Sequence, residues 1–280
     1  MARVIQPAIS SVPTSSKNRC RAAGNADLRV RVTHGAPANR VARVLKPAIS
    51  LVPTASKNEN RSQLLKAYRR LGKLYGIPRR RRSGTALDEL ILTILSQNTN
   101  DRNSGEGFRR LKAAFADWAA VENAPWQKVA AALRVAGLAN VKSRRIQAIL
   151  RRLREAHGGY TLEFLRKMET TAARDYLLAI PGVGPKTAAC VLLFSFGKPV
   201  FPVDTHIHRV TRRLGIIPEK MNAEAAHEEL QKLVPLQLAY PLHILVIRHG
   251  RNTCHAQHPT CPECVLLDIC PTGKRLTATA

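Results

Sequence analysis

Apolar positions recur every three or four residues over most of the chain beyond residue 60. One stripe runs from Leu64 through Leu71 to Tyr75, and the stretch Ala86–Leu95 is apolar on nearly every side. Such spacing is typical of helices that pack one face against a core. No segment shows the sustained alternation of apolar and polar residues that a half-buried strand requires. The pattern predicts an all-α protein.

Further helices are expected in the middle of the chain. Asp117 can cap a short helix that carries Trp118, and residues 141–157 interleave basic side chains with apolar ones. The helical part has roughly 215 residues, which is enough for two packed lobes.

The first sixty residues differ from the rest. They hold ten Lys and Arg side chains against two acidic ones, with many Ser, Pro and Asn residues. The motif Pro-Ala-Ile-Ser at residues 7–10 returns at 47–50, and Val-Pro-Thr at 12–14 returns at 52–54. This composition predicts that residues 1–60 form a disordered basic extension with an internal repeat. An Arg-rich N-terminal segment with few acidic residues also occurs in organelle transit peptides. The internal repeat instead favours an extension that arose by duplication.

The net charge of the chain indicates which class of partner it binds. Its net charge is +26, from 45 Lys and Arg against 19 Asp and Glu, and the excess is not confined to the N-terminal extension. A field of this sign attracts a polyanion, and nucleic acid is the default partner. No run of eighteen apolar residues occurs, so no membrane-spanning segment is expected.

A short glycine hairpin separates two apolar helical stretches. Gly182 and Gly184 permit positive φ and the close approach of a ligand, and Pro185 suits the first turn of the second helix. We therefore expect the backbone of Gly182, Val183 and Gly184 to face outward at a helix N-terminus. Such an end suits an anion, for example a DNA phosphate.

Two side chains near this hairpin suit nucleophilic chemistry. Lys186 lies in the first turn of the second helix, and a neutral lysine amine can attack a sugar carbon. The alternative is that Lys186 contacts only phosphate. Asp204 begins the segment Asp-Thr-His-Ile-His-Arg-Val, where it can cap a helix. Capping and catalysis are compatible roles for this aspartate.

Four of the six cysteines form a C-x6-C-x2-C-x5-C run, namely Cys254, Cys261, Cys264 and Cys270. Four thiolates on one short loop suit a [4Fe–4S] cluster or a zinc ion. Disulfides are not expected, since no secretory signal peptide is recognisable. Zinc sites usually pair two C-x2-C knuckles, and the single one here favours iron–sulfur. Cys190, within an apolar helix, is expected to be a packed thiol.

These motifs resemble, in residue type and order, the endonuclease III branch of the helix-hairpin-helix DNA glycosylases. The family hairpin Leu-Pro-Gly-Val-Gly-x-Lys-Thr-Ala is present with Ile180 in place of leucine. The family segment Val-Asp-Thr-His-Ile-x-Arg-Val is intact at residues 203–210, and the cysteine spacing matches the family's [4Fe–4S] loop. The resemblance covers residues 62–272.

The resemblance implies a two-lobed helix-hairpin-helix glycosylase fold. Residues 86–197 would form a six-helix barrel lobe that carries the hairpin. Residues 61–85 and 198–280 would form a helical lobe with the cluster loop. The resemblance also implies that the active site lies in the cleft between the lobes, with Lys186 on one wall and Asp204 on the other.

The resemblance also implies an activity. The chain would be a base-excision-repair DNA glycosylase with AP lyase activity, removing oxidised pyrimidines and cutting 3′ to the abasic site by β-elimination. Lys186 would be the Schiff-base nucleophile and Asp204 its partner. The expected partner is double-stranded DNA with damaged bases or abasic sites, bound by a monomer. A bacterial protein of this kind would be cytoplasmic and nucleoid-associated, and organelle targeting is the alternative.

Two other functions stay open from the sequence. One is a sister glycosylase for a mismatch, an alkylated base or a pyrimidine dimer. The other is a non-catalytic helix-hairpin-helix DNA-binding module.

The family fills the gap left by an extruded nucleotide with inserted side chains. In the matching loop, residues 95–101, Asn98 stands where the family usually has glutamine, and Gln97 comes one position earlier. This departure leaves the reading of the opposite base and the substrate range open. The second filler would be Leu138, which could otherwise be a core leucine at a helix end.

Overall fold

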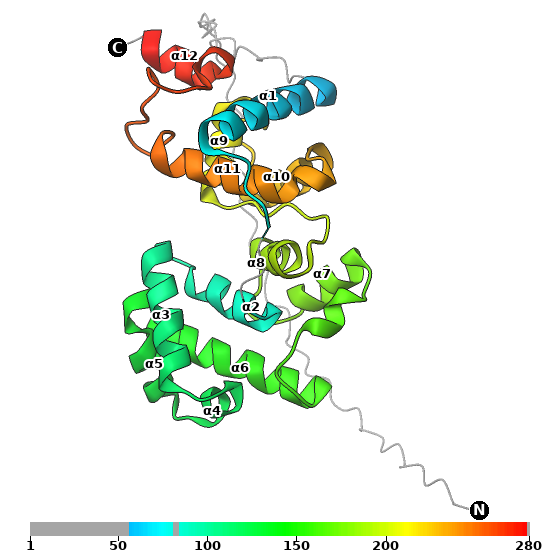
Figure 1. Ribbon diagram of the computed structural model, residues 1–280, viewed down its shortest axis with the longest axis vertical. Coiled ribbons are helices and arrows are strands. Elements are labelled where there is room, and N and C mark those ends of the chain that lie inside the picture. The colour runs from blue at the N-terminus through cyan, green and yellow to red at the C-terminus, as the bar shows by residue number, and fades with distance from the viewer. Residues whose placement is uncertain (1–55, 81–83, 279–280) are drawn as a thin grey trace, which may run out of the picture. The chain divides into compact units, whose positions relative to one another are not determined.

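The computed structural model describes residues 56–80 and 84–278 (Figure 1). Over these ranges the chain is helical and contains no strand, which confirms the all-α prediction. Helix α1 (Lys57–Tyr75) begins a few residues earlier than the boundary expected at residue 60. The cause is a capping box, in which Ser56 and Glu59 each accept a hydrogen bond from the other's backbone N–H. The duplicated segment lies outside the described residues.

One group of helices lies between residues 86 and 196. Its elements are α2 (Ala86–Leu95), α3 (Asp101–Ala114), α4 (Trp118–Asn123), α5 (Trp126–Leu133), η1 (Arg134–Ala136), α6 (Ala139–His157), η2 (Glu163–Arg166), α7 (Thr170–Leu178), α8 (Pro185–Cys190) and the π-helical η3 (Val191–Phe196). Helix α6 packs against α4 and α5, whereas α2 packs against α3 and α8. Their shared core includes Leu90, Leu133 and Leu150, all fully buried.

A second group joins α1 to the C-terminal third of the chain (Figure 1). Its later elements are α9 (Thr205–Arg213), α10 (Ala223–Leu233), η4 (Leu236–Leu238), α11 (Ala239–Asn252), η5 (Leu267–Ile269) and α12 (Pro271–Ala278). Helix α11 packs against both α1 and α9, and α12 packs against α9. The two groups meet where α10 contacts α8 and α11 contacts η3. This arrangement confirms the predicted two-lobed fold.

Within residues 56–80 and 84–278, no single helix is long and apolar enough to cross a membrane. The bent pair formed by α10 and the segment Leu236–Asn252 meets both criteria only when its two parts are taken together, and they are bent by 116°. Its apolar side chains, such as Leu230 and Leu245, belong to the buried core.

Candidate active site

The hairpin between α7 and α8 has the backbone geometry that its glycines predict. Gly182 has a φ of +82°, a value that favours glycine, and Gly184 is the N-cap residue of α8. Both glycines are exposed. Within the described part of the chain, no hydrogen bond engages their N–H groups. These two groups are therefore available to an anion at the helix N-terminus.

The backbone N–H of Val183, unlike those of Gly182 and Gly184, does not face outward. The predicted anion contact therefore involves fewer N–H groups than expected. The Val183 N–H donates to the Ile180 carbonyl oxygen at 3.0 Å, and the side chain of this residue is buried. An N–H already used inside a turn is not free for a phosphate. Val183 therefore shapes the hairpin, and the anion contact falls to Gly182 and Gly184.

Lys186 lies in the first turn of α8, Asp204 is the N-cap residue of α9, and both are half-buried. Asp204 caps α9 as predicted, because its Oδ1 accepts a hydrogen bond from the Ile207 N–H at 2.8 Å. Both Lys186 and Asp204 interact electrostatically with two buried groups, the thiol of Cys190 and the imidazole of His243. Lys186 and Asp204 therefore share the same two buried neighbours.

The two buried neighbours are electrically neutral near pH 7. Burial raises the pKa of the Cys190 thiol to about 12, so the thiol stays protonated, as expected for a packed cysteine. Burial lowers the pKa of His243 to about 4. The Nδ1–H of this histidine lies 3.0 Å from the Pro202 carbonyl oxygen, two residues before Asp204. His243 thus supports the segment that leads to the aspartate, a role that the sequence did not reveal.

Glu89 is a further acidic residue that the sequence interpretation missed. It lies on α2 and interacts electrostatically with Lys186. Burial raises the pKa of its carboxyl group, while a hydrogen bond from the Thr93 hydroxyl at 3.2 Å and the charge of Lys186 act in the opposite direction. A lone glutamate within an apolar helix was the available signal for it.

The predicted gap-filling residues lie on two loops with unusual backbone geometry. Asn98 is exposed with a φ of +54°, and Leu138 is 54% exposed with a φ of +49°. Positive φ is uncommon for residues other than glycine and tends to occur at functional positions. The exposure of Leu138 excludes the alternative of a core leucine. Gln97 is half-buried, and its Oε1 accepts a hydrogen bond from Arg145 Nη1 at 2.8 Å.

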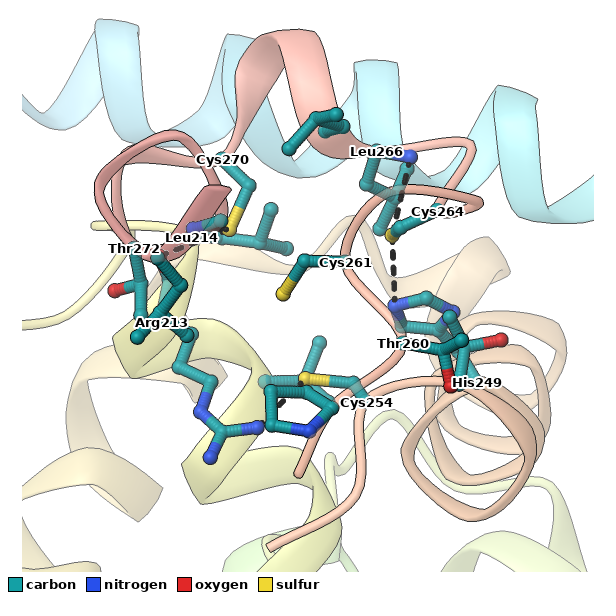
Figure 2. Close-up of a pocket in the computed structure, with 16 residues that line it drawn as sticks. Arg213, Leu214, His249, Cys254, Thr260, Cys261, Cys264, Leu266, Cys270 and Thr272 are labelled. Carbon is teal, nitrogen blue, oxygen red and sulfur yellow. Dashed lines mark hydrogen bonds between the residues drawn. The ribbon is translucent and has the colours of Figure 1, made fainter. Parts of the chain in front are cut away.

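The four cysteines of the C-terminal run line one pocket (Figure 2). They are Cys254, Cys261, Cys264 and Cys270. Apolar side chains such as Val210 and Leu266 line the same pocket, together with His249. The loop between α11 and α12 thus brings all four thiols to a common space.

Several donors point at these sulfur atoms. The Gly273 N–H donates to Cys270 Sγ at 3.2 Å, and Arg213 Nη1 donates to Cys254 Sγ at 3.2 Å. A further backbone N–H donates to Cys264 Sγ at 3.4 Å. Donors of this kind stabilise thiolate sulfur, which is the form that binds metal. The donor set therefore fits a thiolate-ligated group.

The spacing of these ligands bears on the kind of metal group. Across residues 56–80 and 84–278, no three His, Cys, Asp or Glu side chains converge closely enough to hold one ion. In a four-iron cluster each cysteine binds a different iron, so the sulfurs surround a larger body than a single zinc ion. Four cysteines around one pocket are a ligand set that suits such a cluster.

Comparisons with known sequences identify the family of this chain. The family model described as HhH-GPD superfamily base excision DNA repair protein matches residues 91–236. Endonuclease III of Thermotoga maritima is 33% identical over 198 residues, which cover 71% of this chain and 88% of that protein. Endonuclease III of Escherichia coli K12 is 36% identical, covering 65% of this chain and 81% of that protein. A relative from Arabidopsis thaliana is 37% identical, and the chain spans 57% of its length.

Solved structures of DNA glycosylases share the fold of this chain. A non-covalent endonuclease III–DNA complex matches with a TM-score of 0.68 and 28% identity, covering 80% of this chain and 99% of that one. A thermostable thymine-DNA glycosylase matches with a TM-score of 0.66, over 79% of this chain and all of that one. At 20% identity, the second likeness shows the fold alone. The chain therefore belongs to the HhH-GPD superfamily of base excision DNA repair proteins, and within it to the endonuclease III family of helix-hairpin-helix DNA glycosylases.

Proposed function

We propose that this chain is a bifunctional DNA glycosylase and AP lyase that removes oxidised pyrimidines from double-stranded DNA as a monomer. The observation that carries the proposal is the lysine in the first turn of α8, which shares the buried neighbours Cys190 and His243 with the aspartate that caps α9. A glycosylase that only hydrolyses its substrate needs no amine nucleophile. Lys186 and Asp204 together supply a nucleophile and a fixed negative charge.

The proposed reaction has two chemical steps. With the damaged nucleotide extruded, the amine nitrogen of Lys186 attacks the sugar C1′ as the base leaves, and Asp204 stabilises the developing positive charge. Ring opening gives an imine between Lys186 and the sugar. Loss of a C2′ proton then expels the 3′ phosphate, which is the β-elimination that cuts the strand. Water finally releases the enzyme by hydrolysing the imine.

The hairpin and the C-terminal loop would hold the DNA for these steps. The N–H groups of Gly182 and Gly184 suit a backbone phosphate. A [4Fe–4S] cluster held by Cys254, Cys261, Cys264 and Cys270 would fix the loop between α11 and α12. It would supply structural rigidity to the loop and no step of the reaction.

A panel of duplexes, each with a single defined lesion, tests the proposed substrate. Oxidised pyrimidines should be excised fastest in single turnovers, and an abasic duplex should be nicked and trapped covalently by borohydride. Preferred excision of thymine opposite guanine, of an alkylated purine or of a pyrimidine dimer would instead identify a sister glycosylase. Binding without excision or trapping would identify a non-catalytic DNA-binding module.

The N-terminal extension gives a separate prediction. Deleting residues 1–55 removes mainly basic charge and leaves the α1 capping box intact. Binding to undamaged DNA should weaken most at low salt, and the slope of log affinity against log salt should become shallower, because fewer counterions are released. Single-turnover cleavage with saturating enzyme should change by less than about twofold, since the extension adds only sequence-independent attraction. Loss of cleavage in a folded deletion variant would place the extension in the active site.

A further inference from the structure

One basic side chain of α6 is almost completely buried. Lys142 is 2% exposed, and within residues 56–80 and 84–278 it forms no ion pair. Its Nζ instead donates to two carbonyl oxygens, those of Leu95 at 2.7 Å and Ala136 at 2.8 Å. A buried ammonium is unfavourable unless its donors are satisfied, so these two acceptors account for its position.

The two acceptors are the final residues of helical segments. Leu95 ends α2 and Ala136 ends η1. The last carbonyls of a helix lack partners within the helix and carry partial negative charge, so an ammonium is a favourable cap for them. The loop with Asn98 follows the first segment, and Leu138 follows the second. Lys142 therefore joins the bases of the two loops that carry the exposed, positive-φ residues.

A second side chain on the same face of α6 extends this connection to the hairpin. Arg145, one turn after Lys142, donates to Gln97 Oε1 at 2.8 Å. It also lies against Gly182, where an added Cβ would clash with the Arg145 guanidinium. Any larger residue at position 182 would displace the guanidinium. One helix face thus contacts both gap-filling loops and the hairpin.

We propose that Lys142 is a positioning residue that fixes the separation of Asn98 and Leu138, so that both side chains enter the base stack when the nucleotide is extruded. This inference rests on the glycosylase function proposed above. Residues in left-handed conformations keep them only where the surroundings hold the backbone, and Lys142 anchors the backbone just before both of them. Arg145 supports the first loop from the side. Preorganised loops lower the entropy lost on insertion.

The chain offers a matched control on the same helix. Gln147 is buried like Lys142, and its Nε2 donates to the carbonyl oxygens of Val121, Glu122 and Ala124 at 2.9, 3.2 and 2.7 Å. It thus anchors the connection between α4 and α5, which carries none of the proposed DNA contacts. Loss of either side chain leaves buried carbonyls unpaired, but only Lys142 anchors the gap-filling loops.

The test compares Lys142→Met with Gln147→Met in the full chain. The first probe is a duplex with a tetrahydrofuran abasic analogue beside 2-aminopurine, whose fluorescence rises when neighbouring bases unstack. Lys142→Met should reduce this rise at saturating enzyme by about threefold or more, and should slow excision of a paired oxidised pyrimidine by about ten- to a hundredfold. Cleavage of a preformed abasic site should slow by less than about threefold, because no base has to leave the stack. Gln147→Met should lower Tm and leave all three DNA measurements unchanged.

Equal losses of excision and abasic cleavage in Lys142→Met, with a normal fluorescence rise, would overturn the proposal. If Lys142→Met does not fold, Arg145→Met removes the lateral support from a half-buried position and should show the same pattern with smaller changes. An unchanged ratio of excision to abasic cleavage in that variant would overturn the proposal as well. A wild-type chain that raises the fluorescence but excises no lesion would contradict the proposed function, and the fluorescence comparison would still test the positioning role.

Discussion

Replacing Lys186 with glutamine should reduce cleavage at an abasic site by about a thousandfold or more, because an amide nitrogen cannot form a Schiff base. The variant should still bind DNA, since the hairpin N–H groups and the basic surface remain. Single-turnover cleavage measures the loss of the chemical step. Borohydride trapping should yield no covalent protein–DNA adduct with the variant, and a strong one with the wild type.

Two controls separate catalysis from charge and folding. Lys167→Gln removes the same charge from an exposed position and should leave cleavage unchanged. Asp204→Asn keeps a good N-cap residue for α9 but removes the carboxylate, so the protein should fold while cleavage slows. If Lys186→Gln nicked an abasic site at the wild-type rate, Lys186 would lose its assigned role. An unchanged rate in Asp204→Asn would leave the aspartate only its capping role.

Replacing Cys261 with alanine should remove most of the bound iron. The wild-type protein should be yellow-brown, with broad absorbance near 400 nm and about four irons per chain. The variant should lose this absorbance. Its Tm should fall, because a bound metal group adds its binding free energy to the stability of the fold. Metal analysis and thermal unfolding measure the two effects.

Cys190 provides the matched control for the metal prediction. It is a buried thiol on α8 and lies outside the pocket that the four other cysteines line. Cys190→Ala should therefore keep the iron content of the wild type. A colourless wild-type preparation, loaded with zinc and fully active, would contradict the proposed cluster.

The local features of this protein could be predicted from its sequence. Asp117 and Asp204 each cap a helix by accepting a hydrogen bond from a backbone N–H three residues later. Gly182 adopts its positive φ because the turn requires it. These features depend on a few neighbouring residues, so short motifs specify them. The cysteine run is equally local, and its spacing alone indicated a metal loop.

Two details of the site could be decided only by the tertiary structure. The sequence left Leu138 open between a gap-filling residue and a core leucine, and the fold exposes it. The N–H of Val183, expected to face outward, is used within the hairpin. The spacing of apolar residues indicates which face of a helix is buried. It does not indicate whether a residue at a helix end or in a turn is covered by another segment. Both outcomes depend on the neighbours that the folded chain supplies.

The electrostatic surroundings of the site were decided by contacts between distant segments. His243 and Glu89 reach the neighbourhood of Lys186 from α11 and α2. Lys142 meets a carbonyl oxygen 47 residues earlier in the chain. The sequence determined the helices, the hairpin and the candidate nucleophile, because each of these depends on nearby residues. Burial and long-range hydrogen bonding arise only when remote helices pack together, so the positions of these supporting groups became known from the tertiary structure alone.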